Sequence, residues 1–180
     1  MNSLNAAILL LLLCSTELLA QRGPGDGQLC ESVRVLLQAS SNDFNSVKRN
    51  VTRHSDGATD WVPSVNVAGT QDCEGQSDAS ISSSISCTVA DSDSSDEVAA
   101  IYRKKVQEIR SCLDSSFVYS EQQGGKSTRR ATPVREATFE IKGKGDDPDG
   151  PAVRLTLEQI HTARRSGYEL TIWIDARQKE

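Results

Sequence analysis

Four cysteines divide the body of this chain and limit the folds open to it. They are Cys30, Cys73, Cys87 and Cys112, and a fifth, Cys14, lies in an apolar N-terminal run. Cysteines with this spacing in a small exported chain indicate disulfides. A zinc site is disfavoured because no Cys-x-x-Cys spacing occurs and neither histidine stands at a metal-ligand spacing from a cysteine. The fold is therefore expected to bring these four side chains together in pairs.

The side of each element on which a cysteine falls favours one pairing. Cys73 and Cys87 share the parity of the apolar residues in two predicted strands, and same-face residues of neighbouring antiparallel strands lie about 4.5–5.5 Å apart. Cys30 and Cys112 lie on the apolar sides of two predicted helices. These positions favour Cys73–Cys87 and Cys30–Cys112, although four cysteines allow three pairings.

The N-terminus has the form of a secretory signal peptide. Residues 7–13 read Ala-Ile-Leu-Leu-Leu-Leu-Leu, and Ala20 precedes a stretch rich in Gly and Pro. The apolar run is shorter than the roughly 20 residues that a membrane span needs. We predict a signal peptide over 1–20, a flexible linker over 21–27 and a single disulfide-stabilised domain over 28–180. This predicts a secreted or periplasmic protein with no stable membrane insertion after removal of the leader.

Charge and composition argue against several classes of partner. The chain has 25 acidic and 20 Lys or Arg residues, for a net charge of -5 with the signs evenly mixed. This balance gives no electrostatic reason to expect binding to nucleic acid or to an anionic membrane. Aromatic residues make up only 4% of the sequence, so we expect a modest core of Val, Ile, Leu and Ala.

Apolar periodicity predicts two helices and five strands. The helices are expected over 28–48 and 95–114, and Ser94 with Glu97 forms a capping pattern before the second. The segments 49–60 and 118–133 are polar and are predicted as loops. Alternating patterns predict strands near 64–75, 80–90, 136–141, 153–158 and 168–175.

The predicted strands alternate apolar and polar residues, which favours an antiparallel sheet with one covered face. We predict an α+β fold in which two helices pack on one face of a roughly five-stranded antiparallel sheet. The predicted order is α-β-β-α-β-β-β, and both halves of the chain share a loose layout of a helix followed by strands. The loop at 49–60 holds a glycosylation sequon, Asn50-Val51-Thr52, which has meaning only in some source organisms and often occurs by chance.

No segment matches the full pattern of a catalytic, metal or cofactor site. Residues 124–128, Gly-Gly-Lys-Ser-Thr, resemble the end of a phosphate-binding loop, but Ser120 stands where that loop needs glycine. The aspartates within 91–96 lack the glycine and glutamate of a calcium loop, and those within 146–149 fit an ordinary turn. We therefore predict no catalytic residue, no metal and no cofactor.

The sequence favours a small exported domain that acts by binding a partner, which we expect to be another extracytoplasmic protein. The densest basic run contains Lys126, Arg129, Arg130 and Arg135. It suits an acidic partner, and its alternative role is that of a solvated loop. Trp173 is a further candidate contact residue. Trp61 is another, and packing under a loop is the alternative role for both tryptophans.

Two other functions remain open from the sequence. An extracytoplasmic hydrolase would need His54 or His161 to converge with a serine and with an aspartate such as Asp60 or Asp175. The chain also has the size and address of a structural envelope component.

Overall fold

The computed structural model describes residues 26–54, 56–78, 81–142, 148–163 and 165–176. The predicted signal peptide and most of the predicted linker lie outside these residues. The described chain contains the helices α1 (Asp26–Ser40) and α2 (Ser95–Cys112). Its strands are β1 (Lys48–Arg53), β2 (Thr59–Pro63), β3 (Gln71–Asp78), β4 (Ile81–Ser92), β5 (Phe117–Gln123), β6 (Ala131–Lys142), β7 (Pro148–His161) and β8 (Ser166–Asp175).

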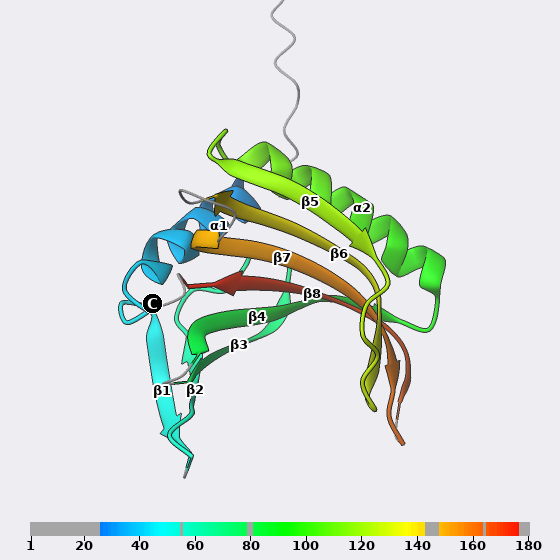
Figure 1. Cartoon of the computed structure of the whole chain (residues 1–180), viewed down its shortest axis with the longest axis horizontal. Coiled ribbons are helices and arrows are strands. Elements are labelled where there is room, and N and C mark those ends of the chain that lie inside the picture. Colours follow the sequence, from blue (N-terminus) through cyan, green and yellow to red (C-terminus); the bar gives the residue numbers. More distant parts are fainter. Residues whose placement is uncertain (1–25, 55, 79–80, 143–147, 164, 177–180) are drawn as a thin grey trace, which may run out of the picture.

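The strands form one antiparallel sheet in the order β1-β2-β3-β4-β8-β7-β6-β5. Each half of the chain is a helix followed by a four-stranded meander, and the two meanders join where β4 pairs with β8. Figure 1 shows both helices on the same side of the curved sheet, with the strand ends bending away from them. Both helices pack against β7 and β8, so the core lies between the helices and the central strands.

The predicted fold class was wrong in the number and order of strands. The observed order is α-β-β-β-β-α-β-β-β-β, and the sheet has eight strands where about five were expected. The segment predicted as a loop over 49–60 contains most of β1 and the start of β2, and the one over 118–133 contains most of β5. The strand predicted near 64–75 is replaced by β2, which ends at Pro63, and β3, which begins at Gln71.

The missed strands lie at or near the edges of the sheet. Beyond Lys48, every residue of β1 is exposed, and β5 alternates only over its first three residues. An edge strand that buries neither face gains its stability from ladder hydrogen bonds, which any polar sequence can form. Apolar alternation therefore could not reveal these strands.

The first helix ends eight residues earlier than the periodicity predicted. Ser40 and Ser41 donate hydroxyl hydrogen bonds to the carbonyls of Leu37 and Gln38, as serine does where a helix terminates. The chain then turns through two residues of positive φ, Asp43 and Phe44. Phe44 and Val47 are nevertheless buried. Their helix-like spacing in the sequence therefore reflects a turn that packs against the core.

The second helix lies within the predicted range of 95–114. The Ser94 hydroxyl accepts a hydrogen bond from the backbone N–H of Glu97, which caps the N-terminus. Acidic residues Asp96 and Glu97 occupy the first turn and Arg110 the last, as the helix dipole favours. The buried face carries Val98, Tyr102, Val106, Ile109 and Cys112.

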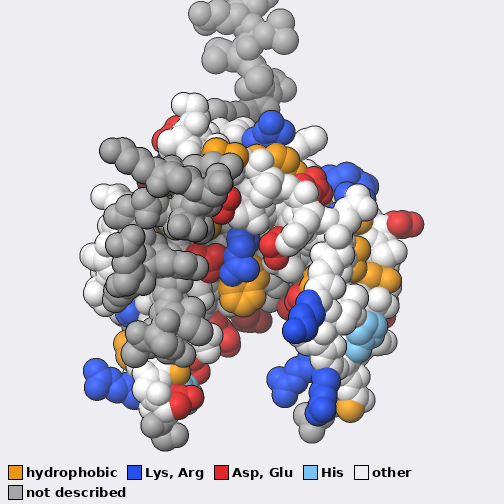
Figure 2. All heavy atoms as spheres, in the orientation of Figure 1, with side chains coloured by type: hydrophobic (Ala, Val, Ile, Leu, Met, Phe, Trp, Pro, Cys, Tyr) orange, Lys and Arg blue, Asp and Glu red, His pale blue; other side chains and the backbone are white. Residues whose placement is uncertain are grey.

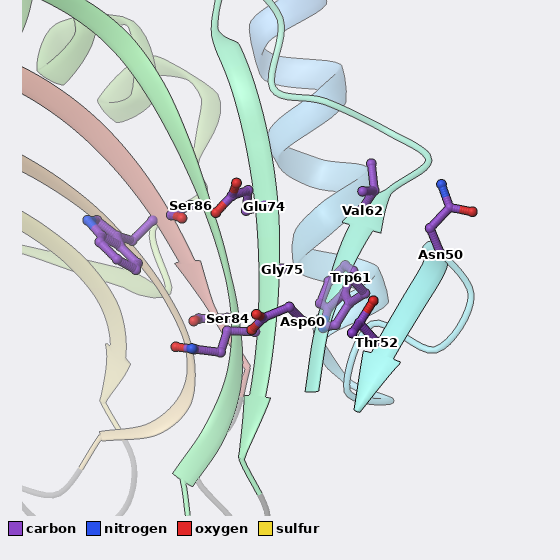
Figure 3. A pocket seen from close by; sticks show the side chains of 11 residues that line it. Asn50, Thr52, Asp60, Trp61, Val62, Glu74, Gly75, Ser84 and Ser86 are labelled. Atoms are coloured by element: carbon purple, nitrogen blue, oxygen red, sulfur yellow. The ribbon is translucent and has the colours of Figure 1, made fainter. Parts of the chain in front are cut away.

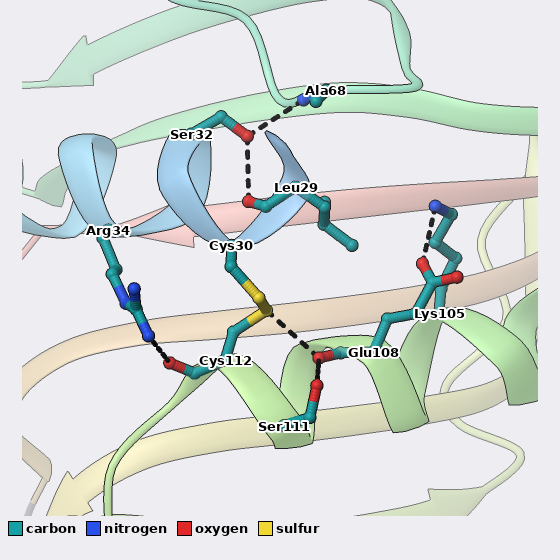
Figure 4. Close-up of a disulfide and its surroundings, with 9 residues drawn as sticks. All are labelled: Leu29, Cys30, Ser32, Arg34, Ala68, Lys105, Glu108, Ser111 and Cys112. Carbon is teal, nitrogen blue, oxygen red and sulfur yellow. Dashed lines mark hydrogen bonds and ion pairs between the residues drawn. A yellow bond between two sulfur atoms is a disulfide. The ribbon is translucent and has the colours of Figure 1, made fainter. Parts of the chain in front are cut away.

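Two disulfides, Cys30–Cys112 and Cys73–Cys87, fasten the fold, and they are the two pairs favoured by the sequence. The first joins α1 of one half to the end of α2 of the other, and beside it Arg34 donates a hydrogen bond to the Cys112 carbonyl (Figure 4). The second joins directly opposed residues of β3 and β4. Two disulfides are consistent with a protein of an oxidising compartment.

Candidate functional site

No helix of the described chain covers the face of the sheet that is turned away from α1 and α2. We call it the open face. Its side chains alternate with the buried ones along the strands and are Asp60, Glu74, Gln76, Ser84, Ser86, Thr88, Glu136, Thr138, Glu140, Arg154, Thr156, Glu158, Glu169, Thr171, Trp173 and Asp175. Figure 2 shows the molecule hollowed between two projecting groups of strand ends, with Asp and Glu side chains around the hollow.

A hollow of about 400 Å³ lies on this face between β1 and β8. Figure 3 shows its lining side chains on successive strands, from Asn50 and Thr52 on β1 to Ser84 and Ser86 on β4. Trp173 on β8, opposite Ser86, forms the other side. Trp61 and Val62 on β2 also line the hollow, which therefore combines polar side chains with apolar surface and has Trp173 at one end.

Trp173 is the centre of a small ordered cluster. Arg154, its cross-strand neighbour on β7, lies with its guanidinium carbon 5.5 Å from the Trp173 ring centroid. The same guanidinium donates two hydrogen bonds to the carboxylate of Asp175, at 2.7 and 3.2 Å. Burial alone would lower the pKa of Arg154, but its hydrogen bonds and attraction to Asp175, with Glu136, raise it. The Arg154 cation is thus held in place against the indole.

Beyond this cluster the open face carries carboxylates that face one another. Glu158 on β7 is directly opposite Glu169 on β8, and Glu136 on β6 is a diagonal neighbour. Partial burial, followed by repulsion from Glu169 and Glu136, raises the pKa of Glu158. Arg165 contacts Glu169 at 3.0 Å and so offsets part of this negative charge. This end of the open face is anionic.

The two tryptophans have different roles. Trp61 is only 2% exposed and lies against Gly75, where a Cβ atom would come within 2.2 Å of the indole. Its Nε1 donates a hydrogen bond to the Ser77 hydroxyl, and its ring centroid lies 5.7 Å from that of Phe44. Trp61 is therefore a packing residue, which was the alternative to its suggested contact role.

The predicted basic contact residues lie away from Trp173. Lys126, Arg129 and Arg130 are all exposed in the turn between β5 and β6. This turn is next to the end of β7, because the Arg130 carbonyl accepts a hydrogen bond from the backbone N–H of His161. Trp173 lies a further seven residues along β8 from Ser166, the partner of His161, or about 24 Å. The basic turn and Trp173 are thus two separate candidate surfaces.

Among the described residues, the structure does not bring a histidine, a carboxylate and a serine together as a hydrolase would need. His54 Nε2 lies 2.7 Å from Asp60 Oδ2, but both side chains are about half exposed (45% and 53%) at the β1–β2 turn. His161 is exposed at the opposite end of the sheet, and Asp175 is engaged by Arg154. Across the described ranges no serine hydroxyl is hydrogen-bonded to either imidazole, so the geometry gives the hydrolase hypothesis no nucleophile.

The acidic segments also have local roles. Asp91 forms an ion pair with Arg165, and Asp93 and Asp96 are exposed near the start of α2. Asp146 and Asp147 lie outside the described residues. In the part of the chain that the structure describes, no three His, Cys, Asp or Glu side chains are grouped closely enough to hold a metal ion.

The described helices include none that is both long and apolar enough to cross a membrane. No protein-family model, curated protein or solved structure matches the chain.

The Trp173–Arg154–Asp175 cluster is a feature that sequence reasoning missed in part. Trp173 was recognised by residue type, but Arg154 and Asp175 are 21 residues apart in the chain and meet only through the β7–β8 register.

Proposed function

We propose that this chain is a binding domain of an extracytoplasmic compartment, secreted or periplasmic, and that its partner docks on the open face around Trp173. The observation that supports this most strongly is a half-buried tryptophan beside a hollow on a sheet face that no helix covers. Tryptophan and arginine are the residue types most enriched among side chains that dominate binding energy. Trp173 and Arg154 stand next to each other on this face.

The order of the cluster supports the same proposal. Trp173 and Arg154 are on paired central strands, and Asp175 fixes the guanidinium with two hydrogen bonds. A side chain already held in one conformation loses little entropy when a partner binds. The cluster is therefore prepared for contact without rearrangement.

The charge of the open face favours one kind of partner. Partial burial raises the pKa of Glu158, and the nearby carboxylates of Glu169 and Glu136 raise it further because the three groups repel one another when ionised. A protein that presents Lys or Arg side chains there relieves this repulsion. We propose another extracytoplasmic protein with a basic surface as the partner, and we expect added salt to weaken the complex.

A photo-crosslinking scan tests the location of the site. The photoreactive amino acid p-benzoylphenylalanine is placed singly at Ser86, directly opposite Trp173, at Lys126 in the basic turn, and at the exposed Gln107 on α2 as a control. The extracytoplasmic fraction is irradiated, and adducts are identified by mass spectrometry. We expect a discrete adduct from position 86 that is absent from position 107. Adducts from position 126 or 107 alone would place the contact elsewhere and overturn the proposal.

A further inference from the structure

A single position on the outer strand of the sheet combines a modification motif with the exposure that the modification needs. Asn50-Val51-Thr52 is the only Asn-x-Ser/Thr sequence among the six asparagines of the chain, and its middle residue is not proline. The structure assigns a place to this motif on β1, the outermost strand at one edge of the sheet.

All three residues of the motif face solvent. Asn50 and Thr52 are exposed, and the Val51 side chain is 54% exposed. The pairing of β1 with β2 shifts between Arg49 and Thr52, and Asn50 adopts a positive φ of 47° within this irregularity. Its side-chain amide makes no hydrogen bond to a described residue, so a substituent on Nδ2 costs no internal contact.

A second observation concerns the compartment. The Cys30–Cys112 and Cys73–Cys87 disulfides require an oxidising environment during folding. In eukaryotes such an environment is the compartment in which asparagine side chains receive glycans. The motif, its exposure and the disulfides are independent observations, and together they favour modification of Asn50.

We infer that Asn50 is an acceptor for an N-linked glycan. In the transfer, the Asn50 Nδ2 atom forms a bond to C1 of the first sugar of a lipid pyrophosphate-linked oligosaccharide. The bond between C1 and the phosphate oxygen breaks, Nδ2 loses one proton, and the lipid pyrophosphate leaves. The inference does not depend on the proposed binding function.

The glycan would lie at the margin of the hollow. Asn50 is on β1 and Trp173 is on β8, four strand spacings away, or about 19 Å across the sheet. Figure 3 shows Asn50 at the outer rim, with β2 and β3 between it and β4. The glycan therefore covers the β1 edge of the sheet, where it also prevents the edge strand from pairing with another chain.

The chain provides its own matched control. Asn66-Val67-Ala68 repeats the first two residues of the motif, Asn66 is exposed, and only the hydroxyl residue at the third position is missing. Ala68→Thr therefore adds a second motif on the same molecule. Thr52→Ser preserves the motif at Asn50, whereas Thr52→Ala and Asn50→Gln remove it.

The test is expression of the full chain in mammalian cells, followed by digestion with peptide-N-glycosidase and peptide mass spectrometry of cells and medium. We expect the glycosidase to convert Asn50 to Asp and to increase the gel mobility of the protein by the amount that corresponds to one glycan. N50Q and T52A should abolish this mobility shift, T52S should preserve it, and A68T should add a second shift of the same size. An unmodified Asn50 peptide, in cells or in medium, would overturn the inference, most clearly where A68T is modified at Asn66.

Discussion

Single residues decide what each of the two tryptophans does. Trp61 is directly opposite Gly75 on β3, and the missing side chain there gives the indole its place in the core. Trp173 is opposite Ser86 on one side and Arg154 on the other, so its ring stays on the open face beside a cation. Neither environment can be deduced from the local sequence, because both depend on which strands are paired.

Gly75→Ala should therefore destabilise the protein. The added Cβ meets the Trp61 indole at 2.2 Å, and overpacking of this kind typically costs about 1–3 kcal/mol. Gly27→Ala in α1 is the matched control, since a Cβ there meets nothing within 4 Å and alanine favours a helix. Urea denaturation of both variants measures the difference. Equal urea midpoints for the two variants would show that the Trp61 indole does not pack against Gly75.

Glu158→Gln should stabilise the protein at neutral pH. The raised pKa of Glu158 means that the folded state disfavours the ionised carboxylate. Ionised Glu158 therefore lowers the free energy of unfolding at pH values above its folded-state pKa, and this destabilisation disappears as the pH falls. Like charges on opposed strand positions destabilise, and removing one is expected to gain roughly 0.2–1 kcal/mol. The gain should vanish below the unfolded-state pKa of about 4.3.

Thermal melts of Glu158→Gln at neutral and acidic pH measure this effect. Glu31→Gln, at an exposed position on α1, serves as the control for loss of one carboxylate elsewhere. A gain that persists in acid would show that the effect comes from packing and not from charge.

Elements with a long buried face were predicted from the sequence, and short or mostly exposed strands were not. Helix α2 and strands β4, β6, β7 and β8 carry apolar residues at helical or alternating spacing, and each lies close to its expected range. Strands β1 and β2 were missed because they are polar or short. In β5, only Phe117 and Tyr119 pack against the core, which is too little alternation to indicate a strand.

The segment predicted as a loop over 118–133 should behave as two parts. Replacing residues 125–129 by a short Gly/Ser turn should change the free energy of unfolding by less than about 1 kcal/mol, because exposed turns bury little surface. Replacing 117–123 removes Phe117, Tyr119 and the edge strand, and it should cost about 3 kcal/mol or more.

Chemical denaturation of these two replacements distinguishes a folded β5 from a loop. The Tyr102 and Tyr119 hydroxyls both donate to the carboxylate of Glu121, so the 117–123 replacement also removes a contact with α2. A small loss for both replacements would mean that β5 does not contribute to the fold.

The whole molecule consists of two similar halves that share one sheet and one core. They meet through the β4–β8 pairing, the contact between the helices, the packing of α1 on β7 and β8 and of α2 on β4, and the Cys30–Cys112 disulfide. The Cys73–Cys87 disulfide lies within one half. The loose repeat in the sequence predicted two halves, but the strand order came from the sheet register, which no local pattern specifies.

Removal of the two disulfides should have unequal effects. In the chain-entropy model, the separation of 82 residues between Cys30 and Cys112 corresponds to about 4–5 kcal/mol, and the separation of 14 between Cys73 and Cys87 to about 3 kcal/mol. The double variant Cys30→Ser/Cys112→Ser should therefore have the lower urea midpoint. A lower midpoint for Cys73→Ser/Cys87→Ser would show that strain or local packing outweighs the loop entropy.

The affinity of Trp173→Ala for the partner identified by crosslinking tests the proposed binding site most directly. Removing a central tryptophan contact typically costs about 2 kcal/mol or more, which is roughly a thirtyfold rise in Kd. The comparison is Lys126→Glu/Arg129→Glu/Arg130→Glu in the basic turn, and both variants are first checked for unchanged thermal midpoints. We expect the large loss with Trp173→Ala and a change of less than about twofold with the basic-turn variant. The opposite pattern would contradict binding at the open face and place the partner on the basic turn.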